Sequence, residues 1–189
     1  DLHIDGHATG VTGQQLQAYI AAGPRTDHES TTAEEALEKV RLGMVVLIRE
    51  ETAAQNLRTL VPLVTPENAR RFTFSTDDRH PADLIEEGSI DHNVRLAVAE
   101  GLDPVTAVRL ATINAAEAFG LDDRGAIAPG RRADLVVTES LNDFRASSVF
   151  FGGRLVAERG RLVVESVPRT IDDESVRNTI KLDPAGLSF

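Results

Sequence analysis

The chain has 189 residues, of which 41% are hydrophobic and 26% are charged, a composition typical of a soluble globular protein. Its formal net charge of −10 at pH 7 disfavours nucleic acids and anionic membrane surfaces as partners. Because the chain contains no cysteine, disulfides, thiolate metal sites and a cysteine nucleophile are excluded. The sequence has neither a long apolar run nor a signal-peptide pattern, so we expect no membrane partner and a cytoplasmic protein.

The first half of the sequence alternates short strands with helices. Alternating apolar and polar side chains predict strands at residues 2–6 and 71–75, and a short extended segment is expected at residues 24–27. Residues 44–48 are continuously apolar, which is typical of a parallel strand covered on both faces. We therefore expect four strands that are parallel, adjacent and in chain order.

Helices are expected between and after these strands. The patterns T-x-x-Q at Thr12 and T-x-x-E at Thr32 are capping-box signals for the first two helices. A third helix is expected around residues 53–63. Asp103, followed by a proline, predicts the start of a longer helix that reaches Phe119.

From Gly125 onward the pattern changes to apolar runs separated by glycines. This pattern predicts a small β segment with a hairpin turn at residues 152–153. We therefore expect three parts, with the parallel strands in residues 1–124, the β segment in residues 125–167 and an irregular tail in residues 168–189.

Polar side chains follow each of the four expected strands. His7, His28, Glu50 and Asp77 are separated by 21, 22 and 27 residues, about the length of one strand, one helix and two short loops. The same end of each parallel strand should then present these groups to a shared site. A single histidine at such a position is more often a surface or core residue, but four polar groups in phase favour a site. Imidazole and carboxylate without sulfur suit zinc, manganese or iron.

The densest group of charges follows the fourth strand, where Asp77, Asp78, Arg79 and His80 are consecutive. Two adjacent carboxylates repel each other when both are ionised, so a cation, a proton or a substrate is expected to compensate them. The alternative is that one aspartate only caps the following helix. Because successive side chains point to opposite sides of a strand, only one of the two aspartates can face a metal directly.

The sequence resembles the amidohydrolase superfamily and, within it, the bacterial adenine deaminases. The narrower resemblance rests on DGHATGVTGQQLQAYIAAG, RTDHESTTAEEALEKVRLGM, IREETAAQNL and FSTDDRHPADLIEEG. The broader one rests on ATINAAEAFGL followed by GAIAPGRRADLVV, which is similar to the superfamily's final barrel helix and its return into a small β domain. The resemblance implies an α/β fold, the second half of a (β/α)8 barrel followed by a small β segment. It also implies metal-dependent hydrolytic deamination of adenine to hypoxanthine and ammonia.

The resemblance also implies roles for individual residues. His7 and His28 correspond to metal ligands after the fifth and sixth barrel strands, and Asp77 to the eighth-strand aspartate that binds metal and transfers protons. The positions at which groups contacting a purine would lie are those of Arg49, Glu50 and Asp78. The implied cofactor is one or two divalent ions, manganese, iron or zinc, and the implied small-molecule substrate is adenine.

The sequence departs from the superfamily pattern in one respect. It contains neither the His-x-His pair of the first strand nor the bridging residue of the middle of the barrel. We therefore expect the C-terminal half of an enzyme, inactive alone, that forms a homo-oligomer or associates with the missing half of the barrel. Two alternatives remain, namely another amidohydrolase acting on a cyclic amide or amidine, and a catalytically silent binding or assembly module. The zinc deaminases that use H-x-E and P-C-x-x-C are excluded by the lack of cysteine.

Overall fold

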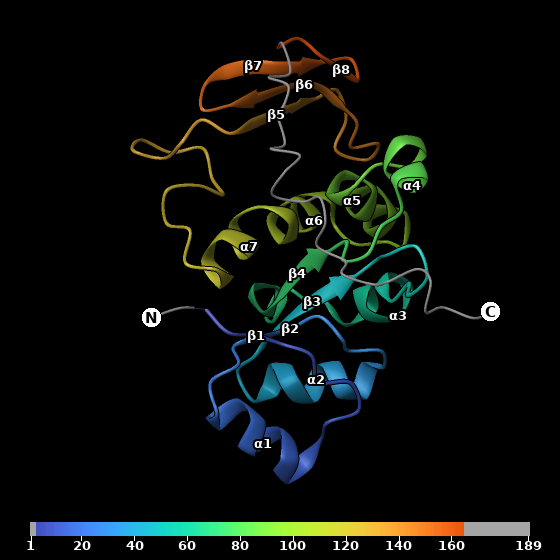
Figure 1. The fold of residues 1–189 in the computed structure, drawn as a ribbon, viewed down its shortest axis with the longest axis vertical. Helices are drawn as coiled ribbons and strands as arrows, with labels where there is room; N and C mark the ends of the chain where they lie inside the picture. The colour runs from blue at the N-terminus through green and yellow to red at the C-terminus, as the bar shows by residue number, and fades with distance from the viewer. Residues whose placement is uncertain (1–2, 165–189) are drawn as a thin grey trace, which may run out of the picture.

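Four short strands form a parallel sheet at the centre of the computed structural model, which describes residues 3–164 (Figure 1). The strands are β1 (Asp5–Gly6), β2 (Thr26–Asp27), β3 (Val45–Arg49) and β4 (Phe72–Ser75). They are hydrogen-bonded in the order β1-β2-β3-β4, and each neighbouring pair is parallel. The expectation of four parallel, adjacent strands in chain order is confirmed, and no closed barrel is seen in the described residues.

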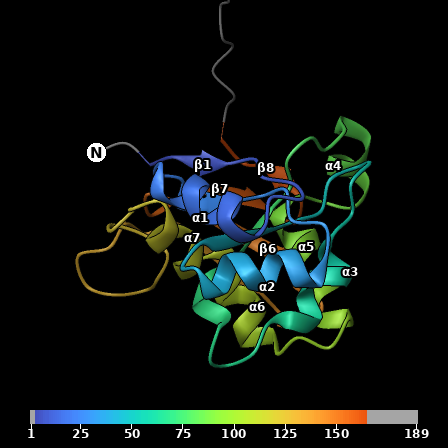
Figure 2. The same ribbon diagram turned by 90° about the horizontal axis from the view of Figure 1, so that it is seen from below.

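Helices cover this sheet and connect its strands. The helices between the strands are α1 (Gly13–Ala21), α2 (Ala33–Arg41) and α3 (Leu57–Leu60), with 3₁₀ turns η1 (Val61–Leu63) and η2 (Ala69–Arg71). After β4 come α4 (Pro81–Glu86), α5 (Ile90–Ala99), α6 (Pro104–Ala111) and α7 (Ile113–Ala118). In Figure 1, α1 and α2 lie at the end of the parallel sheet formed by β1 and β2 and α5 to α7 lie at the β4 end, and Figure 2 shows α1 and α2 from below. Within residues 3–164, no helix is both long and apolar enough to cross a membrane.

The hydrophobic core packs on one face of β3 and β4, the face that carries Val46, Ile48 and Phe72. Val46, Ile48 and Phe72 are fully buried, and they lie in one cluster with Leu57, Leu60, Val94, Ala97 and Leu110 from the surrounding helices. Each fully buried aliphatic or aromatic side chain of this kind stabilises the fold by about 1.5–3 kcal/mol. Leu47 and Thr73, which point to the opposite face, are 6% and 0% exposed, so the prediction that the continuous apolar run is covered on both faces is confirmed.

A second sheet lies beyond α5 to α7 (Figure 1). Its strands are β5 (Leu135–Thr138), β6 (Ala146–Phe151), β7 (Arg154–Glu158) and β8 (Arg161–Leu162), which are antiparallel and hydrogen-bonded in chain order. Gly152 and Gly153 connect β6 to β7 with φ values of 56° and 80°, a left-handed backbone that glycine adopts without strain. The predicted hairpin turn is thus confirmed, whereas the expected tail at residues 168–189 lies outside the described residues.

The third predicted helix is shorter than expected, because residues 53–56 are not helical. Asn56 donates its backbone N–H to the carbonyl of Arg49 at 3.0 Å, and Glu50 forms an isolated antiparallel bridge with Gln55. These contacts turn the chain back along the end of β3. The helix begins only at Leu57, whose backbone N–H donates to the Glu50 carboxylate at 3.1 Å.

The prediction of one long helix from Asp103 to Phe119 is wrong, since the structure has two helices, α6 and α7, that meet at Thr112. The start is as predicted, because the Asp103 carboxylate accepts the backbone N–H of Thr106 at 2.8 Å. Thr112 has φ −129° and ψ −91°, and its hydroxyl donates to the Val108 carbonyl at 2.7 Å, a bond that competes with helix continuation. The break directs Asn114 of α7 toward β4, where it donates to the Phe72 carbonyl at 2.9 Å.

The two predicted capping boxes have different outcomes. Thr32 accepts the backbone N–H of Glu35 at 3.3 Å, as predicted. Thr12 is the N-cap of α1 but makes no side-chain capping bond, and the backbone N–H of Gly13 donates instead to the Glu38 carboxylate at 2.8 Å. The side chain of Glu38 in the neighbouring helix α2 therefore caps α1 in place of the Thr12 hydroxyl.

Candidate metal centre

The two histidines predicted as ligands lie side by side at the carboxyl end of the parallel sheet. His7 follows β1 directly and His28 follows β2 directly, and the parallel register brings both strand ends to one edge. The ring centroids are 5.5 Å apart and the planes are inclined at 79°. Sequence spacing alone therefore predicted correctly that these two imidazoles come together.

Glu29 belongs to the same cluster. Its Oε1 atom lies 3.6 Å from Nδ1 of His7 and 3.9 Å from Nε2 of His28. One ligand atom from each of the three residues lies within 4.8 Å of the others, a spacing that one metal ion can occupy. Sequence reasoning missed Glu29, because it considered one polar residue after each strand. The signal was the carboxylate that directly follows His28 in the sequence.

The tautomer of His28 is fixed by Asp5 of β1. Nδ1 of His28 lies 2.9 Å from Oδ2 of Asp5, and an ionised carboxylate can only accept, so the ring nitrogen is the donor. The lone pair then resides on Nε2, the nitrogen on the Glu29 side. A carboxylate behind an imidazole in this way is the usual support of a metal-ligating histidine.

Asp77 is connected to this cluster through Arg49. Nη1 of Arg49 donates to Oε1 of Glu29 and to Oδ2 of Asp77, the latter at 3.3 Å. Asp77 groups with Glu51 and Asp78 in a second set of carboxylates whose ligand atoms lie within 4.8 Å of one another. Convergence of His7, His28 and Asp77 on one ion stays a prediction.

The three predicted purine-contacting residues have different surroundings. Arg49 is buried, and besides its ion pairs with Glu29, Glu51 and Asp77 it donates to the side-chain oxygen of Asn56 at 3.3 and 3.4 Å. Glu50, which directly follows β3, is also buried, and its carboxylate accepts the backbone N–H of Leu57 at the start of α3. Burial raises the pKa of Glu50 above its ordinary value, against a lowering contribution from the Leu57 N–H. Asp78 is exposed. Contact of these residues with a purine stays a prediction.

The donor set of the site fits a divalent cation. It offers imidazole nitrogen and carboxylate oxygen without sulfur, which suits zinc, manganese or iron. Three carboxylates, those of Glu29, Glu51 and Asp77, pair with the guanidinium of Arg49, and Asp78 groups with Glu51 and Asp77, so negative charge is in excess. Together with the tautomer of His28, this excess favours a cation at the strand ends.

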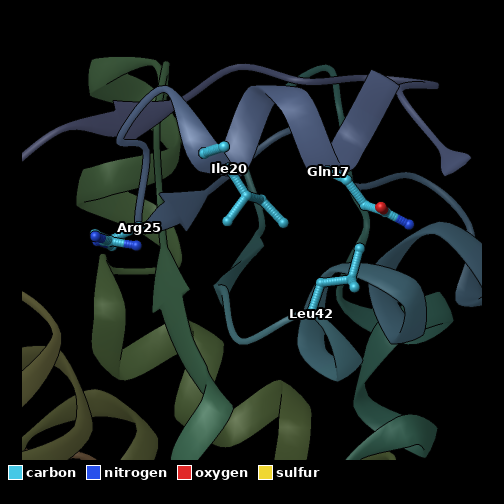
Figure 3. A pocket seen from close by; sticks show the side chains of 5 residues that line it. Gln17, Ile20, Arg25 and Leu42 are labelled. Atoms are coloured by element: carbon cyan, nitrogen blue, oxygen red, sulfur yellow. The ribbon is translucent and has the colours of Figure 1, made fainter. Parts of the chain in front are cut away.

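A surface cavity of about 300 Å³ lies elsewhere (Figure 3). Gln17 and Ile20 of α1 line it together with Leu42, which follows α2, and Arg25, which precedes β2. Because Arg25 is at the amino end of its strand, the cavity is at the opposite end of the sheet from the histidines. It is therefore separate from the candidate metal centre.

Comparisons with known proteins agree with this geometry. The chain is 51% identical over 181 residues to an adenine deaminase of Nitratidesulfovibrio vulgaris (strain DP4), which covers 96% of this chain and 31% of that protein. It is 55% identical over 157 residues to an adenine deaminase of Desulfatibacillum aliphaticivorans, with 83% of this chain and 28% of that protein covered. The chain thus spans less than a third of the length of these curated relatives.

A solved structure and a family model extend the comparison to the fold. The crystal structure of N-acetyl-D-glucosamine-6-phosphate deacetylase from Mycobacterium smegmatis has a TM-score of 0.62 and 25% identity, covering 80% of this chain and 47% of that chain. The model of the amidohydrolase family matches residues 1–156. With the histidine pair at the carboxyl end of a parallel α/β sheet, this match shows that the chain belongs to the amidohydrolase family.

Proposed function

We propose that this chain provides two histidine ligands and the proton-transferring carboxylate of a metal-dependent enzyme that hydrolyses adenine to hypoxanthine and ammonia. The observation that supports it most is the pairing of His7 with His28 beside Glu29 in a family of hydrolases. The choice of adenine is supported by the names of relatives at 51% and 55% identity.

The proposed ligands are His7, His28 and Asp77, and their donor atoms suit one or two ions of manganese, iron or zinc. Such an ion, when bound, supplies the Lewis acidity that makes a water molecule reactive at neutral pH. Asp5 keeps His28 in the tautomer that presents Nε2 to the ion. Arg49 bonds both Glu29 and Asp77, so it holds the second carboxylate beside the histidine cluster.

Asp77 is the proposed proton carrier. Its side chain is 31% exposed, so the carboxylate reaches the open side of the site where substrate would enter. It would take a proton from the attacking water and deliver it to the exocyclic amino group of adenine, which leaves as ammonia. Arg49, Glu50 and Asp78 are the proposed purine-contacting residues.

We further propose that the parallel sheet is the second half of a (β/α)8 barrel. Four parallel strands in chain order, with helices whose buried side chains share one core cluster, support this assignment, as does the amidohydrolase family match. β1 and β4 are the outer strands of the described sheet, and an unpaired parallel edge favours pairing with further strands. The proposed partner is therefore the other half of the barrel or a second copy of the chain. Sedimentation of the 189-residue chain as a monomer at high concentration would argue against this partner.

The test of the function is ammonia release from adenine by the complete, metal-loaded protein that contains this chain. Asp77→Asn keeps the shape of the side chain but removes the proton acceptor, so the rate should fall by about 10²–10⁴-fold. Asp78→Asn is the matched control, since it removes a neighbouring charge, and it should affect the rate less.

Two outcomes would reject parts of this proposal. If the Asp77→Asn protein were as active as the wild type, Asp77 would not be the proton carrier. If the complete protein did not turn over adenine but hydrolysed a cyclic amide, the alternative amidohydrolase activity would be favoured instead.

A further inference from the structure

Three ionisable side chains are buried directly beneath the histidine cluster. Asp27 and Lys39 are 0% exposed and Glu35 is 5% exposed. Nζ of Lys39 lies 2.8 Å from Oδ2 of Asp27 and 2.7 Å from Oε1 of Glu35. We call these residues the buried triad. The proposed mechanism uses none of them.

The buried triad holds the first histidine loop, residues 7–12. Ala8, the residue after His7, is held at both of its backbone polar atoms, because its N–H donates to Asp27 at 2.8 Å and its carbonyl accepts from Lys39 at 2.9 Å. Glu35 accepts the backbone N–H of Gly10 at 2.8 Å. The imidazole of His7 is itself 71% exposed. Its position is therefore set through the backbone.

The same three side chains hold the second histidine loop, residues 28–32. Asp27 accepts the backbone N–H of Glu29 at 3.2 Å and the hydroxyl of Ser30 at 3.0 Å. Lys39 donates to the same hydroxyl oxygen at 3.1 Å, and Glu35 accepts the backbone N–H of Thr31 at 3.2 Å. Every member of the triad therefore contacts both histidine loops.

Stability alone does not account for this arrangement. A lysine ammonium has three donors, and Lys39 meets four acceptors within 3.1 Å, so none of its donors is left for water. Apolar residues of similar volume often replace a buried ion pair with no loss of stability, because desolvation offsets the attraction between the charges. What apolar residues cannot supply is the set of directional bonds to two separate loops.

We propose that the buried triad sets the separation of the His7 and His28 rings, and that Lys39 is a positioning residue for the metal centre. The inference rests on the proposed function for its metal ligands. It assigns to α2 a role in metal binding that is exerted through hydrogen bonds to the two loops.

The test compares the Zn²⁺ affinity of variants of the 189-residue chain, measured by competition with a chromogenic chelator. Lys39→Met keeps the length of the side chain but removes the bonds that Lys39 donates to Ala8 and Ser30 of the two loops. We expect Zn²⁺ affinity to fall by about 10–100-fold, as when outer partners of metal ligands are removed. The visible spectrum of bound Co²⁺ should change as well, since the ring positions change. Arg41→Met removes an exposed charge from the same helix and should change neither quantity.

Glu35→Gln is a second, milder variant. Oε1 of Glu35 accepts from Gly10 and Lys39 while Oε2 accepts from Thr31, and a glutamine has only one accepting oxygen. One loop therefore loses its bond while the ammonium stays in place. A smaller loss of Zn²⁺ affinity than in Lys39→Met is expected.

Circular dichroism distinguishes loss of positioning from loss of folding. A folded Lys39→Met chain with wild-type Zn²⁺ affinity and an unchanged Co²⁺ spectrum would overturn the inference. If Lys39→Met does not fold, the same result for Glu35→Gln decides the question. Wild-type affinity in a His28→Ala chain would instead refute the metal centre, and the inference with it.

Discussion

Asp77 has a left-handed backbone with φ +46°, a conformation that costs a non-glycine residue about 1–2 kcal/mol. Glycine at position 77 removes this cost, but it gives the unfolded chain extra freedom worth about 0.5–1 kcal/mol. Alanine keeps the strain, and both variants lose the ion pair with Arg49. The free energy of unfolding should therefore be higher for Asp77→Gly than for Asp77→Ala, by up to about 1.5 kcal/mol.

Urea unfolding followed by circular dichroism measures this difference. Ala18→Gly, at an exposed position within α1, is the matched control, and it should lower the free energy of unfolding by about 0.5–1 kcal/mol. Glycine in place of alanine should therefore raise the free energy of unfolding at position 77 and lower it at position 18. If Asp77→Gly were less stable than Asp77→Ala, the left-handed backbone at position 77 would be refuted.

Three further predictions concern residues around the site. Burial raises the pKa of Glu50, so the folded state binds its proton more tightly than the unfolded state, and stability falls as pH rises from the ordinary to the raised value. In Glu50→Gln, the free energy of unfolding measured from acidic to neutral pH should no longer show this fall. Asn114→Leu leaves the Ala69 and Phe72 carbonyls without their donor, and urea unfolding should show a loss of about 1–3 kcal/mol for each carbonyl left unsatisfied. Gly6→Ala would place a Cβ atom 2.6 Å from the Thr26 carbonyl and 2.7 Å from the Tyr19 hydroxyl that binds the His7 N–H, so thermal stability and Zn²⁺ affinity should both fall.

The parallel sheet and the edge that holds the site were predictable because both depend on short-range patterns. A continuous apolar run identified β3, and regular spacing put His7 and His28 in phase on neighbouring strands. In a parallel sheet, residues that directly follow neighbouring strands lie at the same edge, so equal spacing along the chain brings their side chains close together. The histidine pair therefore followed from spacing and strand type alone.

The remaining site residues depend on partners that are distant in the sequence. The capping-box pattern gave Glu35 a local role, whereas its carboxylate bonds Gly10, 25 residues earlier. Arg49 pairs with Glu29 across 20 residues, and no periodicity encodes that contact. Asn114 of α7 likewise donates to the Phe72 carbonyl, 42 residues earlier. Local propensity cannot anticipate such tertiary bonds.

Two kinds of buried interaction support the candidate site, and strand length accounts for the difference. β4 pairs with β3 along four residues, and it is anchored to its helices by neutral bonds. The anchoring bonds run from Thr73 to the Leu110 carbonyl at 2.7 Å and from Asn93 to the Ser75 carbonyl at 3.0 Å. β1 and β2 have only two residues each, so backbone pairing fixes little of the loops that follow them. Charge-assisted bonds are shorter and stronger than neutral ones, and the buried triad supplies them where the sheet is shortest.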